Sequence, residues 1–132
     1  MTRIVSLLLL LYTIIAAQQA TQDDYAELSV YEVKALIDSA QQILLLDVRT
    51  ESEYTGSLGH IDSTMLIPVQ DLTDRISELK PYQDHDIIVI CRSGNRSRQG
   101  TKILRQAGFK AYNMAGGMLA WNEMKVEKHN EK

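Results

Sequence analysis

The sequence predicts an α/β domain built on a mainly parallel β-sheet. Short runs at 43–48, 65–67 and 86–90, apolar apart from Asp47 and Asp86, are typical of strands that are buried on both faces of a sheet. Segments with helical spacing separate these runs, and such alternation favours parallel strands joined by helices. The chain has 132 residues, 45% of them hydrophobic and 23% charged, which is the composition of one folded globular domain.

Two capping boxes mark helix starts in the first half of the chain. Ser29 and Glu32 have the spacing in which both side chains satisfy free backbone N–H groups, and apolar residues then follow at helical spacing to about Ser39. Thr50 and Glu53 repeat the pattern and predict a short helix that ends near Gly56. The strand at 43–48 therefore lies between two helices.

The second half of the chain continues the alternation. Apolar residues recur every three or four positions after Pro68, and Gly108 has the position of a helix C-cap. The expected elements are a helix over 69–79 closed by Pro81, a strand over 86–90, a helix over 97–107, a strand over 110–114 and a last short helix that carries Leu119, Trp121 and Met124.

The ends of the chain differ in composition from the domain. Arg3 and the apolar run from Ile4 to Ala17 form the pattern of a secretory signal peptide, and the run is shorter than the roughly 20 residues of a membrane-spanning helix. We expect a signal peptide at 1–17, a polar lead-in at 18–28, the folded domain at 29–124 and a charged, frayed tail at 125–132. The expected location is outside the cytoplasm, in the periplasm, and the alternative is an uncleaved N-terminal membrane anchor.

Charge and cysteine content exclude several classes of function. The net charge of −3 provides no basic field for a nucleic-acid partner. Cys91 is the single cysteine, so neither an internal disulfide nor a cysteine-based zinc site can form. The three histidines, His60, His85 and His129, are too far apart in sequence to suggest a metal site.

The most informative segment lies between the strand at 86–90 and the helix that follows. Ligands of open α/β sheets bind at the carboxyl ends of the strands, and a short loop of small residues can point its N–H groups at an anion. This loop consists of Cys91, Arg92, Ser93, Gly94, Asn95, Arg96 and Ser97.

The loop predicts a reactive cysteine. Backbone N–H groups, a helix N-terminus, Arg92 and Arg96 all favour the thiolate form of Cys91, which is the nucleophilic form. The same donors suit an anionic substrate. The alternative is that Cys91 is an inert thiol in the core at the end of a strand.

Several motifs in order resemble the single-domain rhodaneses. They are Leu46-Asp47-Val48-Arg49 with Glu51, Glu53 and Tyr54, then Gly59-His60-Ile61, Ile67-Pro68, the Cys91 loop, Gly108-Phe109, Asn113-Met114, Gly116-Gly117 and Ala120-Trp121. The resemblance covers 29–124. Ser63-Thr64-Met65-Leu66 departs from the usual Ala-x-Asn that precedes Ile-Pro in the family.

The resemblance implies a rhodanese-like fold, with helices on both faces of the sheet, and sulfurtransferase chemistry without a cofactor. Cys91 would take the outer sulfur of thiosulfate as a persulfide and pass it to a thiophilic acceptor, which is cyanide or a thiol. Arg92 and Arg96 would bind the sulfonate end of the donor, and the remaining loop residues through Ser97 would line the substrate site. Asp47, Arg49 and His60 would be structural elements of the fold.

Three other functions stay open at this stage. The first is a non-catalytic binding module, which is the role of rhodanese folds that lack the cysteine. The second is a persulfide carrier for a partner protein, which would need little turnover. A cysteine-loop phosphatase or arsenate reductase places an Arg six positions after the Cys, where this chain has Ser97, with Arg96 one position earlier. The shorter loop suits a sulfur atom better than a phosphoryl group.

Overall fold

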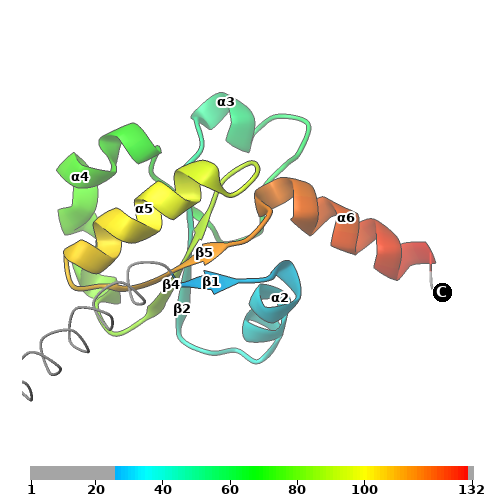
Figure 1. Cartoon of the computed structure of the whole chain (residues 1–132), viewed down its shortest axis with the longest axis horizontal. Coiled ribbons are helices and arrows are strands. Elements are labelled where there is room, and N and C mark those ends of the chain that lie inside the picture. The colour runs from blue at the N-terminus through cyan, green and yellow to red at the C-terminus, as the bar shows by residue number, and fades with distance from the viewer. Residues whose placement is uncertain (1–25, 131–132) are drawn as a thin grey trace, which may run out of the picture.

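The computed structural model describes residues 26–130, which form one layered α/β domain (Figure 1). Helices and strands alternate along most of the chain. In chain order the elements are β1 (Glu27–Leu28), α2 (Val30–Asp38), β2 (Ile43–Asp47), α3 (Glu51–Tyr54), β3 (Met65–Leu66), η1 (Val69–Asp71), α4 (Leu72–Arg75), η2 (Ile76–Tyr82), β4 (Asp86–Ile90), α5 (Asn95–Gln106), β5 (Lys110–Met114) and α6 (Gly117–Asn130).

The five strands of the described chain form one sheet in the order β1-β5-β4-β2-β3, and every pairing is parallel. In the central pairing, Asp47 at the end of β2 lies opposite Ile90 at the end of β4. All five strands therefore point their carboxyl ends toward the same edge. The predicted parallel α/β class is confirmed.

Helices cover both faces of the sheet, as the rhodanese resemblance implied (Figure 1). Successive strand residues point to opposite faces, so each central strand contributes to two hydrophobic clusters. The α5-side cluster includes Leu46, Val89, Leu72 of α4 and Leu104 of α5. The α6-side cluster includes Leu45, Ile88, Ile90, Val33 of α2, and Met118 and Trp121 of α6.

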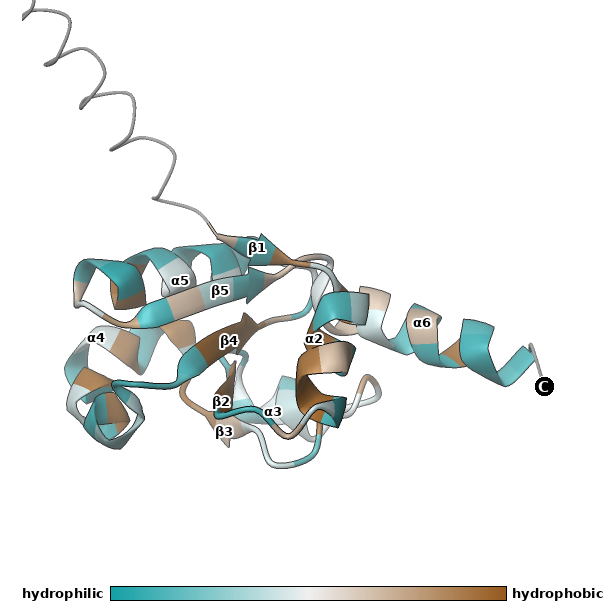
Figure 2. Cartoon of the chain, turned by 90° about the horizontal axis from the view of Figure 1, so that it is seen from below, coloured by the Kyte–Doolittle hydropathy of each residue, from teal (hydrophilic) through white to brown (hydrophobic). Residues whose placement is uncertain are grey.

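The hydropathy of the elements follows this layering. Figure 2 shows β4 in brown at the centre, whereas much of α5 and the end of α6 are teal. The residues of β4 from Ile87 to Ile90 are fully buried. A parallel strand with both faces covered needs such a continuous apolar run.

Both predicted capping boxes are present. The Ser29 side chain accepts from the Glu32 N–H, and the Glu32 carboxylate accepts from the Ser29 N–H at the start of α2. Thr50 and Glu53 make the same reciprocal pair at the start of α3. These local signals place two helices without help from the rest of the fold.

The predicted frayed tail at 125–132 is wrong for residues 125–130. Helix α6 runs from Gly117 to Asn130, because Met124 is buried and Lys, Glu and Val continue the helix. The Tyr31 hydroxyl of α2 also donates to the Glu127 carboxylate at 2.7 Å, which ties the outer part of α6 to the domain.

Three other boundaries differ from the prediction. The lead-in predicted at 18–28 ends in β1, because Glu27 and Leu28 pair with Asn113 and Met114 of β5. The helix predicted over 69–79 is divided into η1, α4 and η2, and Pro81 lies inside the last of these. Helix α5 begins at Asn95 rather than at Ser97.

The predicted signal peptide at 1–17 lies outside the described residues. Among residues 26–130, no helix combines the length and the hydrophobicity needed to span a membrane.

Candidate active site

The predicted loop joins the central strand β4 to helix α5 at the carboxyl edge of the sheet. Cys91 directly follows the last residue of β4, and its side chain is 1% exposed. The loop is short because Asn95 already begins the helix. Cys91 is therefore held at the base of a tight turn between two rigid elements.

Gly94 gives the loop its curvature. Its φ of 108° lies in the region that favours glycine, and it serves as the N-cap of α5. In this conformation the Gly94 N–H donates to the Cys91 Sγ at 3.0 Å. The Ser97 hydroxyl donates to the same sulfur at 3.2 Å from the first turn of α5.

These donors determine the acidity of the thiol. Burial by itself raises the pKa of Cys91, but hydrogen bonds from the Ser97 hydroxyl and from the N–H groups of Ser97, Gly94 and Ser93 outweigh it. The net effect lowers the pKa of Cys91 below its ordinary value. The sulfur is buried, as the alternative interpretation expected, but its surroundings favour a thiolate.

The start of α6 holds the loop from the other side. The Met118 N–H donates to the Cys91 carbonyl at 2.8 Å, and the Leu119 N–H donates to the Arg92 carbonyl at 3.1 Å. Gly117 packs so closely that a Cβ atom there would lie 2.5 Å from the Cys91 carbonyl oxygen. Helix α6 therefore fixes the backbone of the loop while the N–H groups face the sulfur.

The two predicted arginines have different surroundings. Arg96 makes a two-pronged ion pair with Glu53 of α3, with N–O distances of 2.7 and 2.6 Å. This bond to Arg96 is the main reason that the pKa of Glu53 falls to about 2. Arg92 is exposed on the loop. Arg96 thus joins α3 to α5, and Arg92 extends toward solvent.

A polar cavity of about 210 Å³ lies beside the loop, between it and α3. Its lining includes the Arg92 side chain, together with Arg49, Ser52, Glu53, Gly56, Ser57 and Leu58. Ser93 and Asn95 of the loop are exposed, and Gly94 and Ser97 are buried. The loop therefore separates into an inner group around the sulfur and an outer group that faces solvent.

Asp47 and Arg49 form the structural ion pair that the sequence predicted. Arg49 is fully buried, bonds to the Asp47 carboxylate at 2.7 Å, and also donates to the carbonyls of Glu53 and Gly59. His60 stacks on Tyr54 with 3.8 Å between ring centroids and bonds to the Tyr54 carbonyl. Both groups hold the segment around α3 in place.

Three residues near the sulfur were missed as site residues. Glu53 was recognised only as a capping residue and part of a family motif, and Gly117 and Asn113 only as parts of family motifs. Asn113 of β5 is fully buried, and its side-chain oxygen accepts a hydrogen bond from Ser97. An Asn near the end of a strand, between Tyr112 and Met114, was the one local signal that could have indicated a role.

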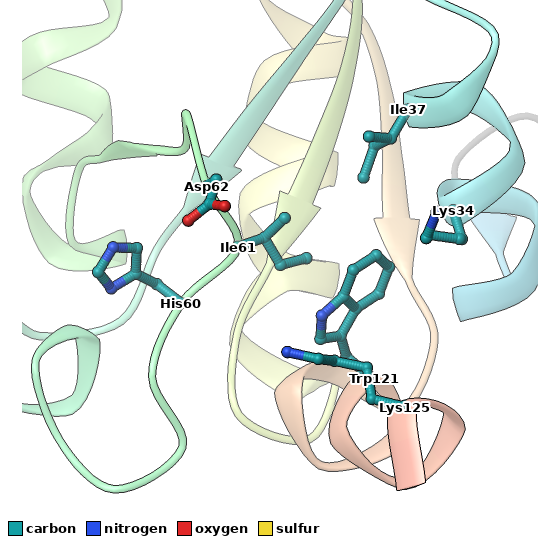
Figure 3. A pocket seen from close by; sticks show the side chains of 7 residues that line it. All are labelled: Lys34, Ile37, His60, Ile61, Asp62, Trp121 and Lys125. Atoms are coloured by element: carbon teal, nitrogen blue, oxygen red, sulfur yellow. The ribbon is translucent and has the colours of Figure 1, made fainter. Parts of the chain in front are cut away.

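A second cavity, of about 270 Å³, lies between α2, α6 and the segment at 60–62 (Figure 3). The Trp121 indole ring lies between Ile37 and Ile61 in this view, and Lys125 extends beneath it. None of the loop residues 91–97 is part of its lining. Within residues 26–130, no group of three or more His, Cys, Asp or Glu side chains is arranged to hold a metal ion.

The Rhodanese-like domain model matches residues 29–124, the same range that the sequence motifs indicated. The chain belongs to the rhodanese-like domain family. The match covers strands β2 to β5, the helices from α2 to the first half of α6, and the Cys91 loop, and β1 lies just before it.

Two relatives of this rhodanese-like domain are named as sulfurtransferases. The Bacillus subtilis protein YtwF, named as a sulfurtransferase, is 35% identical over 72% of this chain and 88% of its own length. A sulfurtransferase of Allochromatium vinosum is 35% identical over 61% of this chain and 73% of its own. These relatives support a sulfurtransferase.

Solved structures agree with this assignment. A rhodanese-related protein of Thermoplasma volcanium is 28% identical, with a TM-score of 0.68 over 76% of this rhodanese-like chain and 93% of its own. A rhodanese-like domain protein of Staphylococcus aureus is 27% identical, with a TM-score of 0.66 over 73% of this chain and 90% of its own. The parallel α/β fold is therefore the rhodanese fold.

Proposed function

We propose that this protein moves a sulfane sulfur from thiosulfate, or a related small anionic donor, to a thiophilic acceptor through a persulfide on Cys91. The observation that carries the proposal is the Cys91 sulfur itself. It accepts hydrogen bonds from the Gly94 N–H and the Ser97 hydroxyl, which favour an anionic sulfur at the carboxyl edge of the sheet.

The first step forms the persulfide. The Cys91 thiolate attacks the outer sulfur of thiosulfate, a new S–S bond forms, and the original S–S bond breaks. The bonding electron pair leaves with sulfite, which thereby gains its second negative charge, and the outer sulfur of the persulfide keeps the negative charge that it carried in thiosulfate. Donors already directed at Cys91 would stabilise this charge without rearrangement.

The second step returns the cysteine. Cyanide in the assay, or a thiol in the cell, attacks the outer sulfur, and the bond to the Cys91 sulfur breaks. The electron pair returns to Cys91, which regenerates the thiolate. Neither step consumes an oxidant, a reductant or a metal ion.

We assign binding of the donor's sulfonate end to Arg92, which lines the polar cavity beside the loop. Arg96 supports the same site while it is paired with Glu53, because its guanidinium adds positive charge near the sulfur. The exposed Ser93 and Asn95 complete the entrance of the proposed donor site, and the buried Gly94 and Ser97 contact the sulfur itself.

A thiosulfate-to-cyanide assay tests the proposal. The wild-type protein is expected to form thiocyanate, and the Cys91→Ser variant is expected to form none while it keeps the native circular-dichroism spectrum. Mass spectrometry should find one added sulfur atom on the peptide that holds Cys91 after exposure to thiosulfate, and cyanide should remove it. Thiocyanate formation by Cys91→Ser would contradict the proposed mechanism.

A persulfide carrier is the second candidate, because the Bacillus subtilis protein YrkF, named as a sulfur carrier, is 33% identical over 72% of this chain and 50% of its own length. A carrier would show the added sulfur on Cys91 but little steady-state turnover. Turnover of an aryl phosphate that depends on Cys91 would instead favour a phosphatase. The same purified protein serves all three assays.

We also propose that the protein is exported to the periplasm and that its signal peptide is cleaved near Ala17. The sequence pattern of residues 1–17 supports this proposal. Protein recovered from the periplasm of an expressing bacterium is expected to begin near Gln18 by N-terminal sequencing. A chain that starts at Met1 and stays with the membrane fraction would instead indicate an N-terminal anchor.

A further inference from the structure

The Ser97 hydroxyl faces two acceptors. Its oxygen is 3.2 Å from the Cys91 sulfur and 2.5 Å from the side-chain oxygen of Asn113. A hydroxyl group has one proton to donate. Ser97 can therefore donate to the sulfur or to Asn113, but not fully to both.

All three side chains are buried. Ser97 and Asn113 are 0% exposed, and Cys91 is 1% exposed. An acceptor that loses its donor in such a place has no bulk water to replace it, so the choice made by the hydroxyl carries a free-energy cost.

Glu27 favours one orientation of the Asn113 amide. The Asn113 side-chain nitrogen donates to the Glu27 carboxylate at 3.4 Å, which leaves the amide oxygen facing Ser97. The backbone adds to this arrangement, because Glu27 lies opposite Asn113 in the β1–β5 pairing. A carboxylate cannot donate a hydrogen bond, so it favours this orientation over the flipped one.

We propose that Asn113 is a positioning residue for the Cys91 nucleophile: its side-chain oxygen competes with the sulfur for the single Ser97 proton. The inference rests on the proposed role of Cys91. In the thiol form, Ser97 donates to Asn113, and the S–H group can donate to the Ser97 oxygen. When Cys91 loses its proton, the hydroxyl turns to the sulfur, and the Ser97–Asn113 hydrogen bond is lost.

The competition makes Asn113 a brake on ionisation. The bond from Ser97 to Asn113 stabilises the thiol form, and the thiolate must draw the hydroxyl away from it. Removing the Asn113 oxygen therefore favours the thiolate. Simple damage to the loop would do the opposite, because it would remove the donors that hold the thiolate.

The other charged groups near the sulfur stay in place in this scheme. Helix α6 contributes none in its first turn, since residues 117–122 are uncharged. The remaining groups are Arg92 in the loop, the Arg96–Glu53 pair of α5 and α3, the Asp47–Arg49 pair after β2, and Glu27 with its neighbour Arg98.

The test is the pH dependence of alkylation of Cys91 by iodoacetamide, which reports the thiolate without any sulfur transfer. In the Asn113→Leu variant, the midpoint of the alkylation rate against pH is expected to fall by about one pH unit. Below the midpoint, this shift corresponds to roughly tenfold faster alkylation than in the wild-type protein. The double variant Ser97→Ala/Asn113→Leu should have the same midpoint as Ser97→Ala alone, because Asn113 acts on the sulfur only through the Ser97 hydroxyl.

Glu27→Gln provides a second variant at a partly exposed position, in case Asn113→Leu does not fold. A glutamine amide can donate to the Asn113 oxygen, so the Asn113 amide can flip and present its nitrogen to Ser97. The midpoint is again expected to fall, and again only when Ser97 is present.

An unchanged or raised midpoint in a folded Asn113→Leu variant would overturn the inference. So would a shift of equal size in the Ser97→Ala background, which would indicate a general structural effect. The thiosulfate assay on the wild-type protein tests the proposed function, and the alkylation midpoints test this inference without any sulfur transfer. Failure of one is therefore distinguishable from failure of the other.

Discussion

The Cys91 sulfur owes its character to two opposing effects. Burial to 1% exposure disfavours charge, and a thiol with this burial alone would be an inert core residue. Hydrogen bonds from the Ser97 hydroxyl and from the N–H groups of Ser97, Gly94 and Ser93 reverse the outcome and lower the pKa of Cys91. These donors thus separate a thiol that favours its thiolate form from a packing residue.

Arg92 gives the first prediction at this scale. It lines the polar cavity beside the loop, and we expect Arg92→Ala to raise the KM for thiosulfate about tenfold with a smaller change in kcat. Steady-state kinetics of the thiosulfate-to-cyanide reaction measure both. Lys102→Ala is the control, since Lys102 is an exposed cation further along α5, and its KM should change little. Equal KM values for both variants would remove Arg92 from the donor site.

At the scale of elements, the Glu53–Arg96 pair joins α3 to α5. The bond to Arg96 is the first cause of the drop in the Glu53 pKa from 4.5 to about 2. A carboxyl with a lowered pKa in the folded state stabilises the fold above its unfolded pKa, and this contribution is lost as the pH falls toward 2. Because both side chains are about one-third exposed, water screens the pair and limits the contribution to about 1 kcal/mol.

We therefore expect Arg96→Gln to lower the free energy of unfolding by about 1 kcal/mol above pH 5, with the difference from wild type shrinking as the pH falls from about 4.5 to 2. Urea titrations at several pH values measure the difference. Arg75→Gln is the matched control, because the Arg75–Glu78 pair lies at the surface and should contribute little at any pH. A difference between Arg96→Gln and wild type that is independent of pH would contradict the assignment.

Gly117 gives a second prediction for an element, the start of α6. A Cβ atom there would lie 2.5–2.6 Å from backbone atoms of Cys91 and Arg92, and φ is +58°. Gly117→Ala is expected to lower the free energy of unfolding by at least about 2 kcal/mol, because the cost of overpacking adds to the cost of an alanine in the left-handed conformation. The variant is also expected to lose most of its sulfur transfer. Chemical denaturation and the thiosulfate assay check both.

Gly108→Ala is the control that separates the backbone cost from the cost of overpacking in Gly117→Ala. Its φ is +90°, but a Cβ atom would meet nothing within 4 Å, so only the backbone cost applies. The activity of Gly108→Ala should stay near that of wild type. If Gly117→Ala kept full activity as well, contact with the loop would not be what matters there.

Local signals predicted most elements, and contacts between distant segments account for the rest. The capping boxes at Ser29 and Thr50 and the apolar run of β4 act over a few residues, so they could be recognised directly. The same holds for the Cys91 loop. Strand β1 has only two residues and exists through its pairing with β5, a contact that leaves no periodic pattern.

The errors have similar causes. Glu53 and Arg96 are 43 positions apart, so the capping residue gave no sign of its second partner. The spacing over 69–79 fits short 3-10 segments as well as an α-helix, since Val69 to Leu72 and Ile76 to Leu79 are three-residue steps, and Pro81 lacks an N–H for the next turn. The charged residues after Met124 suggested a frayed tail, whereas the Tyr31–Glu127 bond holds them.

At the scale of the whole molecule, the two hydrophobic clusters share one sheet. Neighbouring residues of β4 belong to different clusters, Val89 to the α5-side cluster and Ile88 to the α6-side cluster. Loss of packing on one face therefore weakens the strand that supports the other. The Cys91 loop depends on both faces, because it leaves β4, enters α5 and is held by α6.

This coupling predicts that the domain unfolds as one unit. Leu104 is fully buried in the α5-side cluster, and Leu104→Ala should cost about 2–5 kcal/mol. Trp121, the single tryptophan, belongs to the α6-side cluster on the opposite face. We expect the urea midpoint of Trp121 fluorescence to fall by the same amount as the midpoint of far-ultraviolet circular dichroism. Leu119→Ala, on the exposed side of α6, is the control. Neither of its midpoints should move by more than corresponds to about 0.5 kcal/mol in the free energy of unfolding.

A fluorescence midpoint that stays in place while the dichroism midpoint falls would mean that the two faces unfold separately. The loop would then lose its support from α5 before its support from α6.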